Sequence, residues 1–224
     1  MKVFLQVLLL AAVLSARSLT AGMIFDNGTP NGVNGDELTI FVESEDFTLA
    51  SSYSLTDVRF WAFEAEGSNA YQGSIAWSIY ADNAGTPGAI LYSGTATATP
   101  FDGTDYAAAG CCGLQEGLQL DFSVGAIPLA GGTTYHLGLH NGPLTVTSAN
   151  GPFFWSTTYP NSSPGGLKQA SPFGSSDWTI TSDGNVWNEH AFQLLEDPVP
   201  EPATFGMLGA GLLGLAAFAR RRLR

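Results

Sequence analysis

The sequence has few charged residues, and basic residues are the scarcest. Only 12% of its 224 residues are charged, and between residues 22 and 198 two basic residues, Arg59 and Lys168, stand against nineteen acidic ones. The net charge of that stretch is therefore −17. So negative a surface repels phosphate backbones, which excludes nucleic acid as a partner.

Cysteine is almost absent. The two cysteines, Cys111 and Cys112, are neighbours, and a bond between adjacent residues cannot join distant parts of a chain. No disulfide framework is predicted, and we interpret the pair as a loop detail rather than a redox site.

Between residues 23 and 198 the sequence also lacks any sustained helical period. Apolar residues instead recur at every second position, which is typical of strands with one buried face, and turns rich in Gly and Asn separate these segments. The sequence therefore predicts an all-β fold in which two antiparallel sheets pack as a β-sandwich. A jelly-roll is the first choice of topology; an immunoglobulin-type Greek key is the second, because the Cys…Trp…Cys pattern is missing. The predicted strands cover 38–42, 58–63, 75–80, 90–93, 118–124, 135–140, 153–156, 178–181 and 191–195.

The N-terminus is predicted to be a signal peptide, residues 1–21. Lys2 precedes an apolar core at residues 3–14, and small residues follow it, which is the pattern of secretory signals. Cleavage is expected after Ala21, with Ser18 as the alternative.

The C-terminal segment, residues 198–224, has three parts in order. Val199, Pro200, Glu201 and Pro202 precede seventeen uncharged residues, 203–219, and a basic cluster at 220–224 follows. Seventeen residues in a helix span about 25 Å, the short limit for crossing a bilayer. A transmembrane helix is predicted there. The basic cluster should stop transfer and stay in the cytoplasm, leaving residues 22–197 outside; its arginines are Arg220, Arg221, Arg222 and Arg224.

This tail resembles the PEP-CTERM sorting signal of Gram-negative bacteria. The resemblance implies export through the secretion translocon, removal of the signal by signal peptidase, and recognition of Pro200-Glu201-Pro202 by an exosortase, a membrane-bound cysteine transpeptidase. The precursor would sit in the inner membrane until the tail is removed. The body would then reach the cell surface or the exopolysaccharide matrix. Residues 74–93 and 118–139 are similar to ectodomains common among such proteins, which carry no assigned activity.

The body offers weak signals for a catalytic or transition-metal site. His136 and His140 lie about 13 Å apart along a strand, too far to share one zinc ion, and are expected to face solvent. Glu64 and Glu66 fit a solvated edge better than a catalytic pair. No Gly-x-Ser-x-Gly nucleophile motif is present. No catalytic residue is predicted.

Two kinds of ligand site stay open. Calcium takes oxygen ligands from loops, and the candidate ligands are Asp82, Asp102, Asp105 and Asp183. Aromatic rings can stack on sugars or fill a core, and the candidates are Trp155, Trp178 and Trp187.

The main hypothesis is therefore a non-catalytic, exported surface or biofilm-matrix protein. The alternative is a carbohydrate-binding module that binds extracellular polysaccharide, and an extracellular hydrolase comes third.

Overall fold

The computed structural model describes residues 22–32, 34–102, 115–145, 151–159, 168–170, 178–180, 189–197 and 211. The chain divides into two compact units, Ala21–Glu196 and the two terminal segments Met1–Thr20 and Asp197–Arg224. Only the first, the body, is described in detail. The predicted signal peptide, residues 1–21, lies outside the described residues, as does segment 203–219 apart from Gly211. Across the described part of the chain, no helix is both long and apolar enough to cross a membrane.

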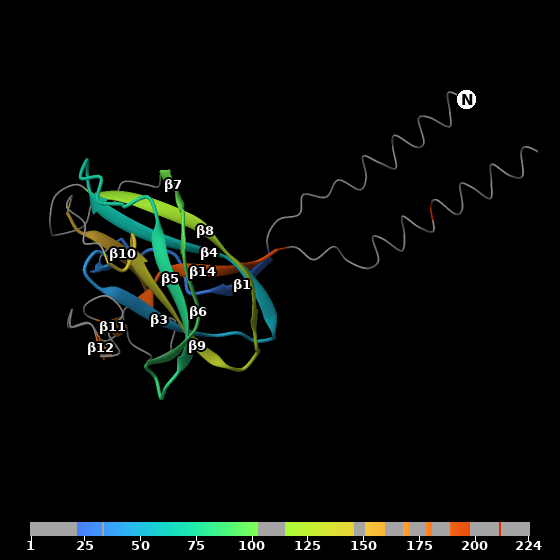
Figure 1. The fold of residues 1–224 in the computed structure, drawn as a ribbon. Coiled ribbons are helices and arrows are strands. Elements are labelled where there is room, and N and C mark those ends of the chain that lie inside the picture. The colour runs from blue at the N-terminus through green and yellow to red at the C-terminus, as the bar shows by residue number, and fades with distance from the viewer. Residues whose placement is uncertain are drawn as a thin grey trace, which may run out of the picture. The chain divides into compact units, whose positions relative to one another are not determined.

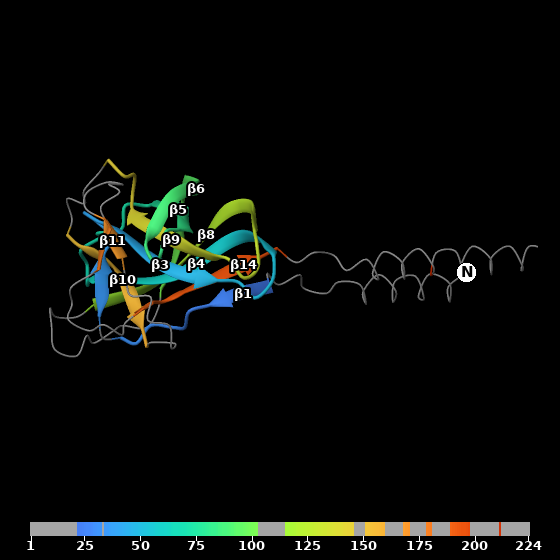
Figure 2. The same cartoon turned by 90° about the horizontal axis from the view of Figure 1, so that it is seen from below.

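The body consists of two antiparallel sheets, which confirms the predicted all-β class and the two-sheet architecture. Figure 1 shows them as two layers, and the turned view in Figure 2 agrees. The eight-stranded sheet contains β1 (Gly22–Asp26), β2 (Gly35–Glu37), β4 (Tyr53–Ala65), β7 (Thr99–Asp102), β8 (Gln115–Leu129), β10 (Phe153–Thr158), β13 (Glu189–His190) and β14 (Phe192–Glu196). The six-stranded sheet has the order β12-β11-β3-β9-β5-β6, and its strands are β3 (Val42–Thr48), β5 (Ile75–Asp82), β6 (Pro87–Ala96), β9 (Thr134–Asn141), β11 (Lys168–Ala170) and β12 (Trp178–Ile180).

The long strand β4 organises the eight-stranded sheet. One edge pairs with β8 from Tyr53 opposite Leu129 to Ala65 opposite Gln115. The other edge is shared, since β14 pairs with residues 57–60 and β10 with residues 62–64. Beyond β14 lies β1, so the first and last strands of the body are neighbours (Figure 2).

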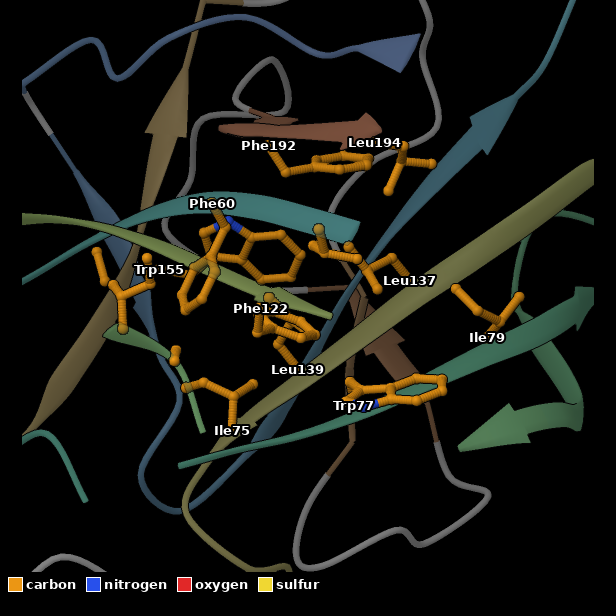
Figure 3. Close-up of a cluster of buried hydrophobic side chains, with 14 of the residues drawn as sticks. Phe60, Ile75, Trp77, Ile79, Phe122, Leu137, Leu139, Trp155, Phe192 and Leu194 are labelled. Atoms are coloured by element: carbon orange, nitrogen blue, oxygen red, sulfur yellow. The ribbon is translucent and has the colours of Figure 1, made fainter. Parts of the chain in front are cut away.

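The core lies between the sheets and uses the faces that the alternation predicts. Figure 3 shows side chains from both sheets meeting there. Phe60 is fully buried and contacts Phe122 and Trp155 edge-on, with ring centroids 6.1 Å apart in each case. Such edge-to-face pairs add about 0.5–1.5 kcal/mol beyond their buried area. The labelled residues from the other sheet are Ile75, Trp77, Ile79, Leu137 and Leu139.

The predicted strand at 38–42 is wrong. Residues 38–40 form a turn, and the strand β3 begins only at Val42. Leu38 is fully buried, its amide donates to Phe153 O, and its carbonyl accepts from the amide of Asn141. The apolar character at Leu38 therefore reflects a turn anchored in the core.

The second face of β5 and β9 is also covered, contrary to the prediction that it faces solvent. A Cβ atom on Gly138 would lie 2.7 Å from the Tyr80 ring, so that ring packs directly on the β9 backbone. Trp178 in turn contacts Tyr80 edge-on at 5.3 Å. His136 and His140 on this face are 1% and 0% exposed.

Candidate functional site

The most unusual feature inside the body is a buried charged cluster that joins the two sheets. His190 on β13 is fully buried; its Nε2 lies 3.3 Å from Asp36 Oδ2 on β2, and its Nδ1 lies 3.4 Å from Glu45 Oε2 on β3. The His190 backbone amide also donates to Glu45 Oε2 at 2.7 Å. Because β3 belongs to one sheet and β13 to the other, this contact ties the layers together. We call Asp36, Glu45 and His190 the buried triad.

The triad keeps His190 charged. Burial alone would lower the pKa of His190, because it penalises the imidazolium, but the neighbouring Asp36 and Glu45 carboxylates raise that pKa to about 9. The ring also stacks on Trp155, with centroids 4.1 Å apart and planes at 14°. A cation over an indole face is a favourable arrangement.

This arrangement is suited to structure rather than to catalysis. His190 is 0% exposed and Glu45 1% exposed, so a substrate in solvent cannot reach the ring nitrogens. The side chain of Trp155 is fixed beside His190, because its Nε1 donates to Ala191 O at 3.0 Å. We infer that the triad fixes how the sheets stack.

Each of the other two histidines contacts an oxygen atom of the protein. His136 Nε2 lies 2.9 Å from Asp82 Oδ1, and this hydrogen bond is the main reason that the pKa of Asp82 falls below its usual value. His140 Nδ1 contacts Gly142 O at 3.1 Å, and burial lowers the pKa of its ring. Of the residues described, no three His, Cys, Asp or Glu side chains come together as metal ligands would.

Of the calcium candidates, Asp82 already has partners. Its Oδ1 accepts from the Gly85 amide, which closes the turn after β5, and also contacts His136. Asp102 is the last residue of β7 and its side chain is not described, while Asp105 and Asp183 lie outside the described residues. The calcium site stays a prediction.

The three tryptophans proposed as sugar-binding residues have different positions. Trp155 is 0% exposed in the core beside Phe60 and Phe122 (Figure 3), so its faces cannot bind a sugar from solvent, and that prediction is wrong for Trp155. Trp178 is half-buried against Tyr80. Trp187 lies outside the described residues.

Sequence reasoning did not bring together a different set of aromatic residues, in which Phe154 lies beside two residues of β4. Trp61 and Phe63 on β4 and Phe154 on β10 lie on the outer face of the eight-stranded sheet and are half-buried. Phe63 and Phe154 stack with centroids 5.0 Å apart and planes at 17°. The alternation along β4 was a usable signal, since it places Trp61 and Phe63 opposite the core residues. We call these three residues the outer aromatic strip.

Polar groups flank the strip. Gln119 on β8 is directly opposite Trp61 in the register. Arg59, one step along the same face, donates from Nε and Nη2 to the Asp121 carboxylate at 2.8 and 2.7 Å. Rings bordered by fixed donors and acceptors can bind a ligand with both apolar and polar faces.

Glu64 is not the solvated residue that the sequence suggested. Its side chain is 5% exposed, and Oε2 accepts from the amide of Tyr71 at 2.9 Å. Glu66 lies beyond the end of β4 in an exposed turn. The two carboxylates therefore have different environments.

The tail that carries the sorting residues lies outside the described residues apart from Gly211, so the comparison with known proteins decides its identity. The model of the PEP-CTERM protein-sorting motif matches residues 198–222. The chain carries a PEP-CTERM sorting motif at its C-terminus. The match covers all three parts of the tail, including Val199, Pro200, Glu201, Pro202 and Arg220–Arg222. No curated protein matches the chain.

Proposed function

We propose that the chain is an exported cargo protein without catalytic activity, which an exosortase processes at its C-terminus. In this proposal signal peptidase removes residues 1–21, and segment 203–219 holds the precursor in the inner membrane with Arg220–Arg222 in the cytoplasm. The body, residues 22–197, then reaches the cell surface or the exopolysaccharide matrix of a Gram-negative bacterium. The observation that carries the proposal is the sorting-motif match over residues 198–222.

The body is consistent with a cargo role. Its strand orders, β1-β14-β4-β8 and β3-β9-β5-β6, with the chain passing repeatedly from one sheet to the other, support a jelly-roll. Glu45 and His190 of the buried triad are closed to solvent, which suits a structural role. Adjacent termini, with Gly22 opposite Glu196, also allow both end segments to be removed without cutting the sandwich.

Processing should depend on the exosortase of the host. In the intact host, we expect the body without its tail at the cell surface or in the medium. In a strain lacking exosortase, the full precursor should accumulate in the membrane fraction. Immunoblotting of both strains with an antibody against the body measures this, and identical processing in the two strains would refute the proposal.

The outer aromatic strip supports a second candidate function, binding of extracellular polysaccharide. Sugar rings present apolar C–H faces to an indole and hydroxyls to groups such as the Gln119 amide. We expect Trp61→Ala to weaken binding to the host's exopolysaccharide about tenfold, or about 1.4 kcal/mol. Affinity electrophoresis measures the change.

Trp178→Ala is the matched control, because Trp178 lies on the other sheet. It should leave binding unaltered. If Trp178→Ala weakens binding and Trp61→Ala does not, the strip is the wrong surface.

A further inference from the structure

A half-buried carboxylate lies at one end of the outer aromatic strip. Glu37 on β2 is directly opposite Phe154 of β10 in the antiparallel register. Side chains at opposed positions lie on the same face of a sheet, with their Cβ atoms about 5 Å apart. Phe154 in turn stacks on Phe63 of β4. The strip therefore crosses from β4 over β10 and ends at Glu37.

The ring of Phe63 reaches as far as the backbone of β2. A Cβ atom on Gly35 would lie 2.9 Å from Phe63 Cζ, closer than carbon atoms pack, so the ring covers this glycine. Gly35 and Glu37 are two residues apart on β2 and lie on the same face. The stacked phenylalanines and the Glu37 carboxylate thus share one small area of the sheet surface.

The Glu37 carboxylate has no counter-charge in the part of the chain that the structure describes. Its side chain accepts no hydrogen bond and forms no ion pair there. Arg59, the basic residue on the same face, is bound to Asp121. Burial raises the pKa of Glu37, because the carboxylate loses water without gaining a partner. A cation bound here would supply that partner.

Rings and a carboxylate together suit an organic cation. An ammonium group is attracted to the face of an aromatic ring within about 6 Å of its centroid, and a charge-assisted hydrogen bond to a carboxylate is about twice as strong as a neutral one. The net charge of −17 over residues 22–198 also attracts cations to the body and repels anions. The sign of the charge therefore favours a cationic ligand over an acidic polysaccharide.

We propose that the outer aromatic strip and Glu37 bind a polysaccharide whose sugars carry free amino groups. The inference rests on the proposed sugar-binding role of the strip and names the class of sugar. The apolar faces of the sugars would stack on the rings, while an ammonium group donates to the Glu37 carboxylate.

The length of the strip favours sugars over a basic protein. Trp61 and Phe63 are two residues apart on one face of β4, about 7 Å along the strand, and Phe154 extends the strip sideways. A single lysine or arginine side chain needs one ring face and one carboxylate. A chain of sugar rings can cover all three aromatic side chains and still reach Glu37.

Two oligosaccharides that differ only in charge test the proposal. A glucosamine oligomer carries an amino group on every sugar, and the same oligomer with every amine acetylated is neutral. Isothermal titration calorimetry of the full-length chain in a neutral detergent measures both affinities, at about pH 6, where amines are mostly protonated and carboxylates mostly ionised. We expect the glucosamine oligomer to bind about tenfold more tightly, the effect of one charge-assisted hydrogen bond.

Substitution of Glu37 tests the site itself. Glu37→Gln should lower the affinity for the glucosamine oligomer about tenfold and leave the affinity for the acetylated oligomer unaltered. Glu66→Gln is the matched control, because Glu66 is exposed in the turn beyond β4 and its substitution removes the same charge from the body. It should leave both affinities unaltered. Equal protease resistance of the three chains shows that folding is intact.

Several outcomes would overturn the proposal: equal affinities of the natural chain for the two oligomers, binding of neither, a preference for glucosamine that persists in Glu37→Gln, or an equal loss in Glu66→Gln. Binding of polylysine that depends on Glu37, without binding of the glucosamine oligomer, would assign the site to a basic protein instead. The sugar-binding role of the strip is judged separately, by the effect of Trp61→Ala on binding to the host's exopolysaccharide.

Discussion

Replacing His190 with glutamine should lower the free energy of unfolding of the body by about 3–5 kcal/mol, the usual cost of removing one partner from a buried ion pair. The substitution leaves two carboxylates, Asp36 and Glu45, without their counter-charge inside the protein. Asp36 is 12% and Glu45 2% exposed at the side chain, so water reaches Asp36 only in part and Glu45 hardly at all. The total free energy of unfolding of a small domain is only about 5–15 kcal/mol. Urea denaturation of residues 22–197 measures the loss.

His136→Gln is the matched control. His136 is as buried as His190, but its partner Asp82 is 30% exposed at the side chain and can be hydrated once the histidine is gone. The loss should therefore be about 1 kcal/mol, close to that of a single hydrogen bond. Equal losses for the two variants would show that the triad has no special role.

The stability of the body should also fall at alkaline pH. The pKa of His190 is about 9 in the folded protein, against 6.5 for an unperturbed histidine. Since the folded pKa is raised, the stabilisation is fully present below pH 6.5 and is lost as the pH rises through 9. The decrease between about pH 7 and about pH 9.5 should be on the order of 2 kcal/mol. In His190→Gln this decrease should disappear.

Substitution of the sorting residues should have the largest effect on the fate of the protein. With Pro200, Glu201 and Pro202 all replaced by alanine, the exosortase loses both the carboxylate and the two rings that fix φ at about −65°. We expect the full-length precursor to accumulate in the membrane fraction and the processed body to fall about tenfold or more, as when a buried recognition contact is lost. Quantitative immunoblotting of cell fractions measures the ratio.

Pro198→Ala is the control for this substitution. Pro198 precedes the Val199–Pro202 motif and has the same chemistry as Pro200, but it lies outside Pro200-Glu201-Pro202, the residues that we expect the enzyme to recognise. Processing should therefore continue. If both variants are processed as the natural chain is, residues 200–202 are not what the enzyme recognises.

The sequence predicts the core correctly in those strands whose own alternation of apolar residues marks the buried face. In β4, β5, β8 and β9 every second residue is apolar over at least five positions, and those faces form the core. A buried face of this kind is decided by neighbours along the strand, which the sequence displays.

The triad could not be predicted in this way. Glu45 points between the sheets from β3 because it meets His190, which lies 145 residues further along the chain. Alternation instead assigns acidic residues to the solvent-facing side of a strand. It therefore does not predict that β3 is a strand with Glu43 and Glu45 buried. The prediction for His136 is wrong for the same reason, since Asp82 of another strand contacts it, and His140, which contacts Gly142 O, is buried as well.

Aromatic residues were the other source of error. Trp155 and Trp61 are chemically the same, but the alternation along β4 already places Trp61 on the outer face, whereas the pairing of Trp155 with Ala62 of β4 places Trp155 in the core. The tail is the opposite case, because its three parts are contiguous in sequence and need no tertiary contact to be recognised.

Mass spectrometry of the protein recovered from its exosortase-containing host tests the central claim most directly. The account predicts a mature chain that begins near residue 22 and has lost the hydrophobic segment and the arginine cluster at residues 203–224. Recovery of a chain that still ends at Arg224 would contradict it.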